Sequence, residues 1–572
     1  MNPIRQKIVV VALSALLPVI FDHAGAHPLE VPEAADAGKA RESGLSDQML
    51  YQFLISEIAG QRGRTDLALR GLVDLAQRTR DPRVARRAVE IAFQARQMDA
   101  ALESATLWLE LEPDSSVARQ ALAAITGNQG SLETTKANLT SLLAQPKRTA
   151  GVLMQLSGLL SRVPDKAAVA TLVSELAKPH LSFPEAHFAI AQANFVAKQT
   201  RVALAAVDEA EKRRPGWAQA AILKSHILRE TSDQTAGNYL KQFLAAYPAA
   251  TEARVAYARL LATQKGYLQA REEFRIAMKS QPGDAEIVYA IGLLSQQVED
   301  HTDADTQFKR VLELKPADAS PVFFNLGSVA EAQKRPTDAI GWYGKVKGGD
   351  YFVTAQLKMA GIVAKRDGMP AGRRFLQDAQ AAQADAPETR IQLILAEAQL
   401  LRDAKAFTEA FGALSDAIDK NPGIADLLYD RAMVAEKIDK FDVLEADLRK
   451  VIELKPDHAH AYNALGYTFA ERNKRLDEAY ELIKKALSLS PDDAFIQDSL
   501  GWVQFRSGRV DEALDTLKKA YQKRRDPEIA AHLGEVLWAK GERAEALSVW
   551  QAALLENPGN DSLRTVIAKF KP

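Results

Sequence analysis

Between Pro456 and Pro558 the chain repeats one short pattern three times: Ala464-Leu465-Gly466-Tyr467, Ser499-Leu500-Gly501-Trp502 and His532-Leu533-Gly534. A small residue follows each Leu-Gly pair at a nearly fixed distance, since Gly501 to Ala513 is twelve residues and Gly534 to Ala546 is twelve again. Large apolar residues recur three or four apart, and a Pro lies near the end of each copy. This spacing predicts two short amphipathic helices that pack closely where the small residues lie, followed by a break.

The pattern resembles the tetratricopeptide repeat, in which a first helix carries Leu-Gly and a second helix carries Ala, an aromatic residue and Ala before a closing Pro. The third copy matches in order and spacing through Leu533, Gly534, Ala546, Trp550, Ala553 and Pro558. A bundle of unrelated helices would show the same amphipathicity, but it has no reason to keep Gly, Ala and Pro in step. The resemblance implies a solenoid of stacked helical hairpins.

The same periodic small residues, apolar residues and closing prolines extend upstream to Pro82. The distance from Pro82 to Pro558 is 476 residues, which is fourteen steps of the 34-residue tetratricopeptide period. With the hairpin before Pro82, the array has about fifteen units. We therefore expect an all-α fold, an α-α superhelix of about fifteen hairpins over residues 46–572 that ends in a C-terminal capping helix. The repeat pattern is weak over residues 128–215 and 345–387. Either the solenoid kinks at these places, or the sequences of these repeats have drifted from the pattern.

Length and composition agree with a repeat array. A single globular core of 572 residues would be unusual. Repeats bury their apolar faces against their neighbours only, so the length of an array is not limited in that way. The chain is 47% hydrophobic and has 73 basic against 74 acidic residues, a balance that argues against nucleic acid as the main partner.

The first 26 residues have the features of a secretory signal peptide. Arg5 and Lys7 precede an apolar run from Ile8 to Phe21, and Ala24-Gly25-Ala26 offers a cleavage site. The run is too short to span a bilayer as a stable helix, so an uncleaved anchor is the lesser alternative. No later run approaches spanning length, and we expect no transmembrane segment after cleavage. Residues 27–45 are expected to form a flexible leader.

The sequence contains no cysteine. Disulfides are therefore excluded. The lipid attachment of a bacterial lipoprotein is excluded as well, because it needs a Cys where this chain has His27. A signal peptide followed by a repeat array favours the periplasm of a Gram-negative cell, with outright secretion as the alternative.

A narrower resemblance lies near the start of the array, in Ser56-Glu57-Ile58-Ala59-Gly60-Gln61-Arg62-Gly63 and Thr79-Arg80-Asp81-Pro82-Arg83. This run is similar to the opening of a family of exported bacterial repeat proteins that includes the lipoprotein adaptor of a periplasmic carboxyl-terminal processing protease. The resemblance implies a spiral array that binds the protease and brings it substrates such as cell-wall hydrolases. Unlike that adaptor, this chain has no Cys for lipidation.

The sequence carries no pattern for catalysis, metals or cofactors. It has no Gly-rich phosphate loop, no paired-His metalloprotease motif and no thiol. His458 and His460 are two apart, a spacing at which helical side chains do not share a face. Asp300, Asp303 and Asp305 lack the Gly and the distal Glu of a calcium loop. We therefore expect a protein that is not an enzyme and that has no catalytic residue, metal site or cofactor.

The tetratricopeptide resemblance also implies where partners would bind. In such arrays the first helices line the concave surface, and the positions just after the Gly and one turn further project into it. In the last copies these positions hold Tyr467, Trp502, Phe505 and Trp538. Large exposed aromatic residues mark interaction surfaces, so we expect a groove that binds other proteins. Packing between adjacent helices is the other open interpretation, above all for Phe505 and Trp538.

Two functions of different classes remain open at this point. The first is a non-enzymatic adaptor that holds a periplasmic processing protease and its protein substrates together, where multivalent contact raises their effective concentration. The second is a structural scaffold for cell-envelope assembly, in polysaccharide export or pilus biogenesis. The proteins that the chain captures would distinguish them.

Overall fold

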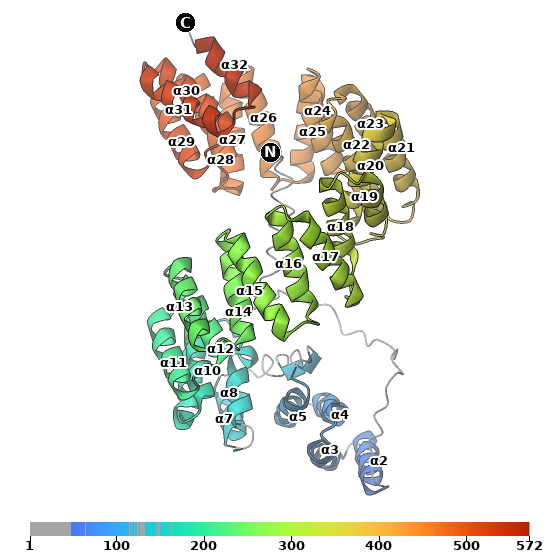
Figure 1. The fold of residues 1–572 in the computed structure, drawn as a ribbon, viewed down its shortest axis with the longest axis vertical. Coiled ribbons are helices and arrows are strands. Elements are labelled where there is room, and N and C mark those ends of the chain that lie inside the picture. The colour runs from blue at the N-terminus through green and yellow to red at the C-terminus, as the bar shows by residue number, and fades with distance from the viewer. Residues whose placement is uncertain are drawn as a thin grey trace. The chain divides into compact units, whose positions relative to one another are not determined.

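The described part of the chain is built from α-helices alone. The computed structural model describes residues 47–570, apart from residues 63, 96, 114, 116, 119, 120, 123, 124, 126–131, 145, 147, 148 and 162. Thirty α-helices follow one another in this part, with no strand among them (Figure 1). The predicted all-α repeat fold is thereby confirmed. The expected signal peptide and leader lie outside the described residues.

The chain divides into two compact units, Met1–Pro316 and Ala317–Pro572. The described helices of the first unit are α2 (Asp47–Gln61), α3 (Thr65–Thr79), α4 (Pro82–Gln94), α5 (Met98–Leu111), α7 (Leu132–Leu143), α8 (Thr149–Leu159), α9 (Lys166–Ala177), η1 (Lys178–His180), α10 (Pro184–Val196), α11 (Thr200–Arg213), α12 (Ala218–Arg229), α13 (Asp233–Ala246), α14 (Thr251–Thr263), α15 (Tyr267–Ser280), α16 (Ala285–Gln297) and α17 (His301–Glu313).

The second unit continues the series of hairpins. Its helices are α18 (Ser320–Ala332), α19 (Pro336–Tyr343), α20 (Phe352–Asp367), α21 (Met369–Ala381), α22 (Pro387–Asp403), α23 (Phe407–Lys420), α24 (Ala425–Lys437), α25 (Phe441–Leu454), α26 (Ala459–Glu471), α27 (Leu476–Leu489), α28 (Ala494–Arg506), α29 (Val510–Lys523), α30 (Pro527–Ala539), α31 (Arg543–Glu556) and α32 (Asp561–Phe570).

Helices pair in the order of the chain. In the second unit α26 packs on α27, α28 on α29 and α30 on α31. The first helices α26, α28 and α30 also contact one another in succession, and each second helix contacts the first helix of the next hairpin. These three hairpins therefore bury their apolar faces against their sequence neighbours, as a solenoid requires.

Local chemistry sets the ends of α28 and α30. The carboxylate of Asp493 accepts hydrogen bonds from the backbone at the start of α28, and that of Asp526 does the same for α30, whose first residue is Pro527. Acidic caps and a Pro in the first turn are favoured there, because the first N–H groups of a helix lack partners within it. Gly508 and Gly541 adopt φ values of 80° and 92° in the turns that follow, a region that favours glycine.

The Gly of the repeat lies where two helices approach closely. A Cβ atom at Gly501 would come within 2.5 Å of Leu517 on the partner helix α29. The same relation joins a first-helix Gly to a large side chain of the second helix in four more hairpins, at Gly292 and Phe308, Gly327 and Tyr343, Gly466 and Ile483, and Gly534 and Trp550. The small residue therefore makes room for a buried large one.

The two stretches with faint repeats depart from regular hairpins. Within residues 128–215, the short helix η1 follows α9 directly, before α10 begins. Within residues 345–387, the turn at Gly368 has a φ of 92° and separates α20 from α21. Just before that stretch, α19 has only 8 residues. None of the described helices has the length and apolar character needed to cross a membrane.

Helix α32 covers the last hairpin. It contacts α30 and α31 and buries Leu563 and Ile567 in the same apolar cluster as Trp550. The ring of Phe570 stacks on Trp550, with 5.5 Å between the ring centroids. Helix α32 thus covers the side of the α30–α31 hairpin on which these residues lie.

Candidate functional site

The four aromatic residues that the sequence singled out lie on three successive first helices. Tyr467 is on α26, Trp502 and Phe505 are on α28, and Trp538 is on α30. Trp502 is 4% exposed, whereas the other three are partly buried. Trp502 is therefore mostly a packing residue, and Tyr467 has more surface to offer a partner.

His532 of α30 connects Tyr467 with Trp502. The imidazole stacks on the Trp502 ring, with the centroids 4.3 Å apart and the planes 22° apart. The ring of Tyr467 lies 6.0 Å from the imidazole, and its hydroxyl oxygen is 3.5 Å from Nε2 of His532. A histidine from the next hairpin thus lies against both aromatic side chains.

A buried carboxylate holds His532 in place. Nδ1 of His532 lies 2.8 Å from Oδ2 of Asp498, a residue of α28 that is 5% exposed. Burial alone would lower the pKa of His532, but the charge and hydrogen bond of Asp498 outweigh it and hold that pKa above its ordinary value. Asp498 thus favours the protonated form of the His532 side chain.

The indole N–H of Trp502 is also satisfied. It donates to Oε2 of Glu471, at the end of α26, over 2.9 Å. Arg506 donates to the backbone oxygen of Glu471 over 3.2 Å and lies near the Trp502 ring. Phe505 completes the surroundings of Trp502, with 5.5 Å between the ring centroids. These contacts join the last turn of α26 to α28.

The surface around this cluster is acidic. Glu528 is exposed, yet the loss of part of its hydration raises its pKa, and the nearby carboxylates of Asp526 and Asp498 raise it further. Burial likewise raises the pKa of Glu535, although His532 opposes that shift. Neither Glu528 nor Glu535 forms an ion pair or a side-chain hydrogen bond within the described residues. We call this region the His532 surface, defined by Tyr467, Glu471, Asp498, Trp502, Glu528, His532 and Glu535.

Trp538 belongs to a different cluster. Its ring stacks on Trp550 of α31 at 6.0 Å and lies 5.8 Å from the ring of Phe570 on α32. Arg543 lies over its face at 5.2 Å. The structure thus brings Tyr467, Trp502 and Phe505 together, and it places Trp538 with the residues that cover the last hairpin. Whether any of the four binds a partner stays a prediction.

Sequence reasoning did not select Glu471, Asp498 and His532. The sequence did offer one indication for two of them. Asp498 lies three residues before Gly501, and His532 lies two residues before Gly534, each inside an otherwise apolar stretch. A polar residue at such a place has to find a partner, because burying it alone is costly. The partner lies on another hairpin, and that pairing depends on the stacking of the first helices.

The described residues hold no group of three or more His, Asp or Glu side chains arranged to bind a metal ion. His458, considered from its spacing to His460, instead caps α26, where its Nδ1 accepts a hydrogen bond from the backbone N–H of Ala461 over 3.1 Å. Its ring lies beside that of Tyr429 at 5.0 Å.

Comparison with known proteins supports the repeat assignment. One tetratricopeptide repeat family model matches residues 504–570, and a second matches residues 289–349 and 429–494. The chain is 33% identical over 514 residues to the TPR repeat-containing protein PA4667 of Pseudomonas aeruginosa, which covers 89% of this chain and 86% of the relative. The chain belongs to the tetratricopeptide repeat proteins. Members of this family mediate interactions between proteins.

Other similar proteins match smaller parts of the chain. The human mitochondrial import receptor subunit TOM70 is 27% identical over 126 residues, which is 22% of this tetratricopeptide repeat protein and 20% of the receptor. The solved structure of TTC0263, a thermophilic TPR protein of Thermus thermophilus, is 24% identical, with a TM-score of 0.29. That match covers 31% of this chain and 97% of the Thermus chain.

Proposed function

We propose that this tetratricopeptide repeat protein is a non-enzymatic adaptor in the periplasm, where it brings a carboxyl-terminal processing protease together with protein substrates such as cell-wall hydrolases. The observation that carries the binding role is the His532 surface, which combines Tyr467 with the unpaired acids Glu528 and Glu535. The residues that resemble the exported protease adaptors, at the start of the array, support the choice of partner. The signal-peptide features of residues 1–26 support the compartment.

The His532 surface suits a docking role because its framework is held internally. Trp502 is buried, its indole N–H bonds to Glu471, and His532 is held by Asp498. A surface that is already ordered loses little conformational entropy when a partner binds. Tyr467 and Glu528 lie at its accessible edge and can contact a partner segment.

An adaptor of this kind needs no chemistry of its own. Two partners held on one array meet at a high effective concentration, and the rate of their reaction rises accordingly. A long array provides separate places for a protease and for a substrate, because each repeat offers its own surface. The reaction itself belongs to the captured enzyme.

Capture from a periplasmic extract, followed by mass spectrometry, tests the proposal. The wild-type chain should retain a serine processing protease together with cell-wall hydrolases. The double variant Glu528→Lys/Glu535→Lys should lose part of this set, because it reverses the charge of the His532 surface. The matched control Glu409→Lys/Glu556→Lys makes the same change in net charge at exposed residues of α23 and α31 that form no ion pair within the described residues, and it should retain the set.

Two results would count against the proposal. Equal capture by both double variants would remove the His532 surface from binding. Enrichment of an export channel or a pilin in place of a protease would favour the alternative, a scaffold for polysaccharide export or pilus biogenesis.

A further inference from the structure

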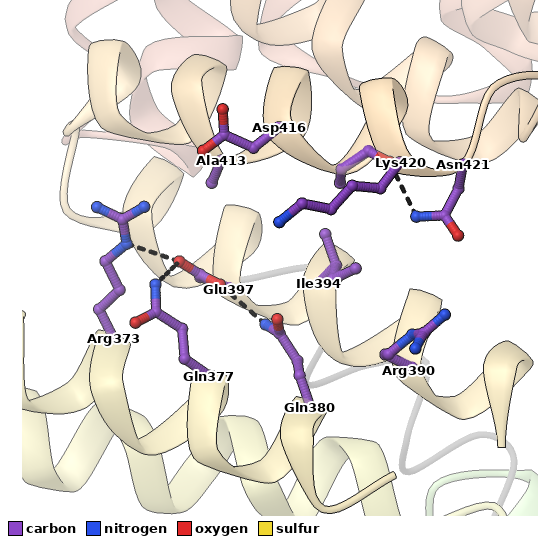
Figure 2. Close-up of a pocket in the computed structure, with 11 residues that line it drawn as sticks. Arg373, Gln377, Gln380, Arg390, Ile394, Glu397, Ala413, Asp416, Lys420 and Asn421 are labelled. Atoms are coloured by element: carbon purple, nitrogen blue, oxygen red, sulfur yellow. Dashed lines mark hydrogen bonds and ion pairs between the residues drawn. The ribbon is translucent and has the colours of Figure 1, made fainter. Parts of the chain in front are cut away.

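A polar cavity of about 480 Å³ lies in the second unit between α21 and α23, with α22 beneath it (Figure 2). Each helix contributes residues spaced about one turn apart, so that one face of each helix is turned toward the same space. The lining residues are Arg373, Gln377 and Gln380 of α21, Arg390, Ile394 and Glu397 of α22, and Ala413, Asp416, Ala417 and Lys420 of α23, with Asn421 at the end of that helix.

Glu397 is a buried carboxylate whose hydrogen bonds come from α21. Its side chain is 4% exposed and accepts from Nε of Arg373 over 2.6 Å. It also accepts from the amide nitrogens of Gln377 and Gln380, over 3.0 and 2.8 Å. Figure 2 shows these three bonds converging on one carboxylate. The charge of Glu397 is therefore already compensated, and its role is to position Arg373.

Arg373 keeps part of its hydrogen-bonding capacity. Its Nε is used by Glu397, but its two terminal nitrogens have no hydrogen-bond partner within the described residues. A guanidinium held by its Nε presents those nitrogens in a fixed direction. Arg373 is thus a fixed donor at one end of the cavity (Figure 2).

Two further cations line the cavity without a partner. Within the described residues, the side chains of Arg390 and Lys420 form no ion pair or hydrogen bond. In Figure 2 the Lys420 side chain extends from α23 over the cavity, and Arg390 lies at the end opposite Arg373. The small side chains of Ala413 and Ala417 leave the space between these groups open.

The charges in the cavity favour an anion. Arg373, Arg390 and Lys420 carry three positive charges, and the acids that line the cavity are Glu397, which is already bonded, and the exposed Asp416. Three positive against two negative charges leave a net charge of +1, and the charged donors of Arg390 and Lys420 are unused. Arginine donors match the oxygens of carboxylate and phosphate groups, and such charge-assisted hydrogen bonds are the strong ones.

We propose that this cavity binds an oxyanion group through Arg373, Arg390 and Lys420. The site is separate from the acidic His532 surface and attracts the opposite charge, so the second unit carries two binding regions of different chemistry. The oxyanion is either a free anion or an acidic side chain of a partner protein. Both present the same oxygen acceptors to the same donors.

Isothermal titration calorimetry of the full chain at low ionic strength tests the proposal, with inorganic phosphate as one probe and a hexaglutamate peptide as the other. We expect the wild-type chain to bind at least one of the probes. The variant Arg390→Gln/Lys420→Gln should lower the affinity for that probe by about tenfold or more, because it removes two charge-assisted contacts. The matched control is Arg374→Gln/Lys405→Gln, which removes the same charge from exposed residues that do not line the cavity. This control should lower the affinity by about twofold at most, because distant charges act on the probe only through long-range attraction that salt screens.

The two probes distinguish the source of the oxyanion. Binding of phosphate alone supports the site and indicates a free anion, and tighter binding of hexaglutamate supports the site and indicates an acidic protein segment. The proposal is overturned if the wild-type chain binds neither probe, or if both double variants weaken binding equally. Circular dichroism of each variant confirms that the helices remain folded during the comparison.

Discussion

Gly534 faces Trp550 so closely that a Cβ atom at position 534 would overlap the indole nitrogen. Trp550 is 1% exposed, and its Nε1 donates to the backbone oxygen of Ala531 over 3.3 Å. The two residues that mark the repeat in the sequence thus form a single contact between α30 and α31. The close approach of the helices depends on the missing side chain at one position and the large ring at the other.

Replacing Gly534 should therefore destabilise the last hairpins. A Gly534→Leu side chain would overpack the contact with Trp550 and should lower the free energy of unfolding by about 1 to 3 kcal/mol or more. Because repeats couple to their neighbours, hydrogen exchange should rise in α28 to α32 and stay unchanged in the first unit. Chemical denaturation and hydrogen exchange with mass spectrometry measure the two effects.

Gly412→Leu provides the control. Gly412 lies in the middle of α23, and a Cβ atom there would meet nothing within 4 Å. Leucine has a higher helix propensity than glycine by up to about 1 kcal/mol, so this variant should be as stable as the wild type or more stable. Equal loss of stability in both variants, or exchange that rises equally in both units, would contradict the role of the Gly534 contact.

Most of the fold followed from the sequence because its determinants are local. The spacing of Gly, Ala and Pro predicted the hairpins, and the contact of Gly534 with Trp550 shows why that spacing exists. The repeat pattern did not predict the division into two compact units after Pro316. That division depends on how the hairpins stack, which the pattern within one hairpin does not specify.

The candidate site was predicted less completely. Tyr467 and Trp502 could be selected from their positions after Gly, but their contact with His532 depends on the register between α28 and α30. The contacts of Trp538 depend on Phe570 of α32, a helix that follows the last repeat and lies outside its pattern. Pairings between separate hairpins are what a repeat pattern leaves undetermined.

Truncation of the two aromatic residues separates packing from binding. Trp502→Ala should cost about 3 to 5 kcal/mol of stability, because Trp502 is buried and large. Tyr467→Ala should be milder for stability and should weaken partner capture by about 2 kcal/mol if the ring is an anchor. Thermal melting and binding are measured on the same preparation of each variant. A loss of stability without a loss of affinity per folded molecule, in both variants, would remove the pair from the binding site.

The contact between His532 and Asp498 predicts a pH dependence of stability. The pKa of His532 in the folded chain is raised above its ordinary value of 6.5, so the contact contributes fully below that value. The contribution is lost as the pH rises through the raised pKa. The second unit should therefore become less stable as the pH rises from near 6 into the alkaline range, and denaturant titrations over that range measure the slope.

His532→Gln isolates this effect, since glutamine does not titrate. The variant should be less stable than the wild type at low pH and should approach it as the pH rises, because the wild type then loses the same charge. Asp498→Asn should flatten the curve in the same way. Parallel pH curves for the wild type and both variants would show that the pair does not titrate as described.

Export can be tested on the natural protein. The charged start, the apolar run and Ala24-Gly25-Ala26 predict a mature N-terminus at His27 and release by osmotic shock. N-terminal sequencing of the released protein measures the first, and immunoblotting of the fractions measures the second. An intact Met1 on a protein retained in the cytoplasm would contradict export and with it the periplasmic part of the proposed function.

The claim that the His532 surface binds a protein partner is tested most directly by photo-crosslinking in living cells. The photoreactive amino acid is placed at position 528 of α30, or, as the matched control, at position 515 of α29, where Asp515 is exposed and forms no ion pair within the described residues. We predict that position 528 crosslinks to a processing protease or one of its substrates and that position 515 does not. No crosslinked protein from position 528, or the same proteins from both positions, would contradict the account.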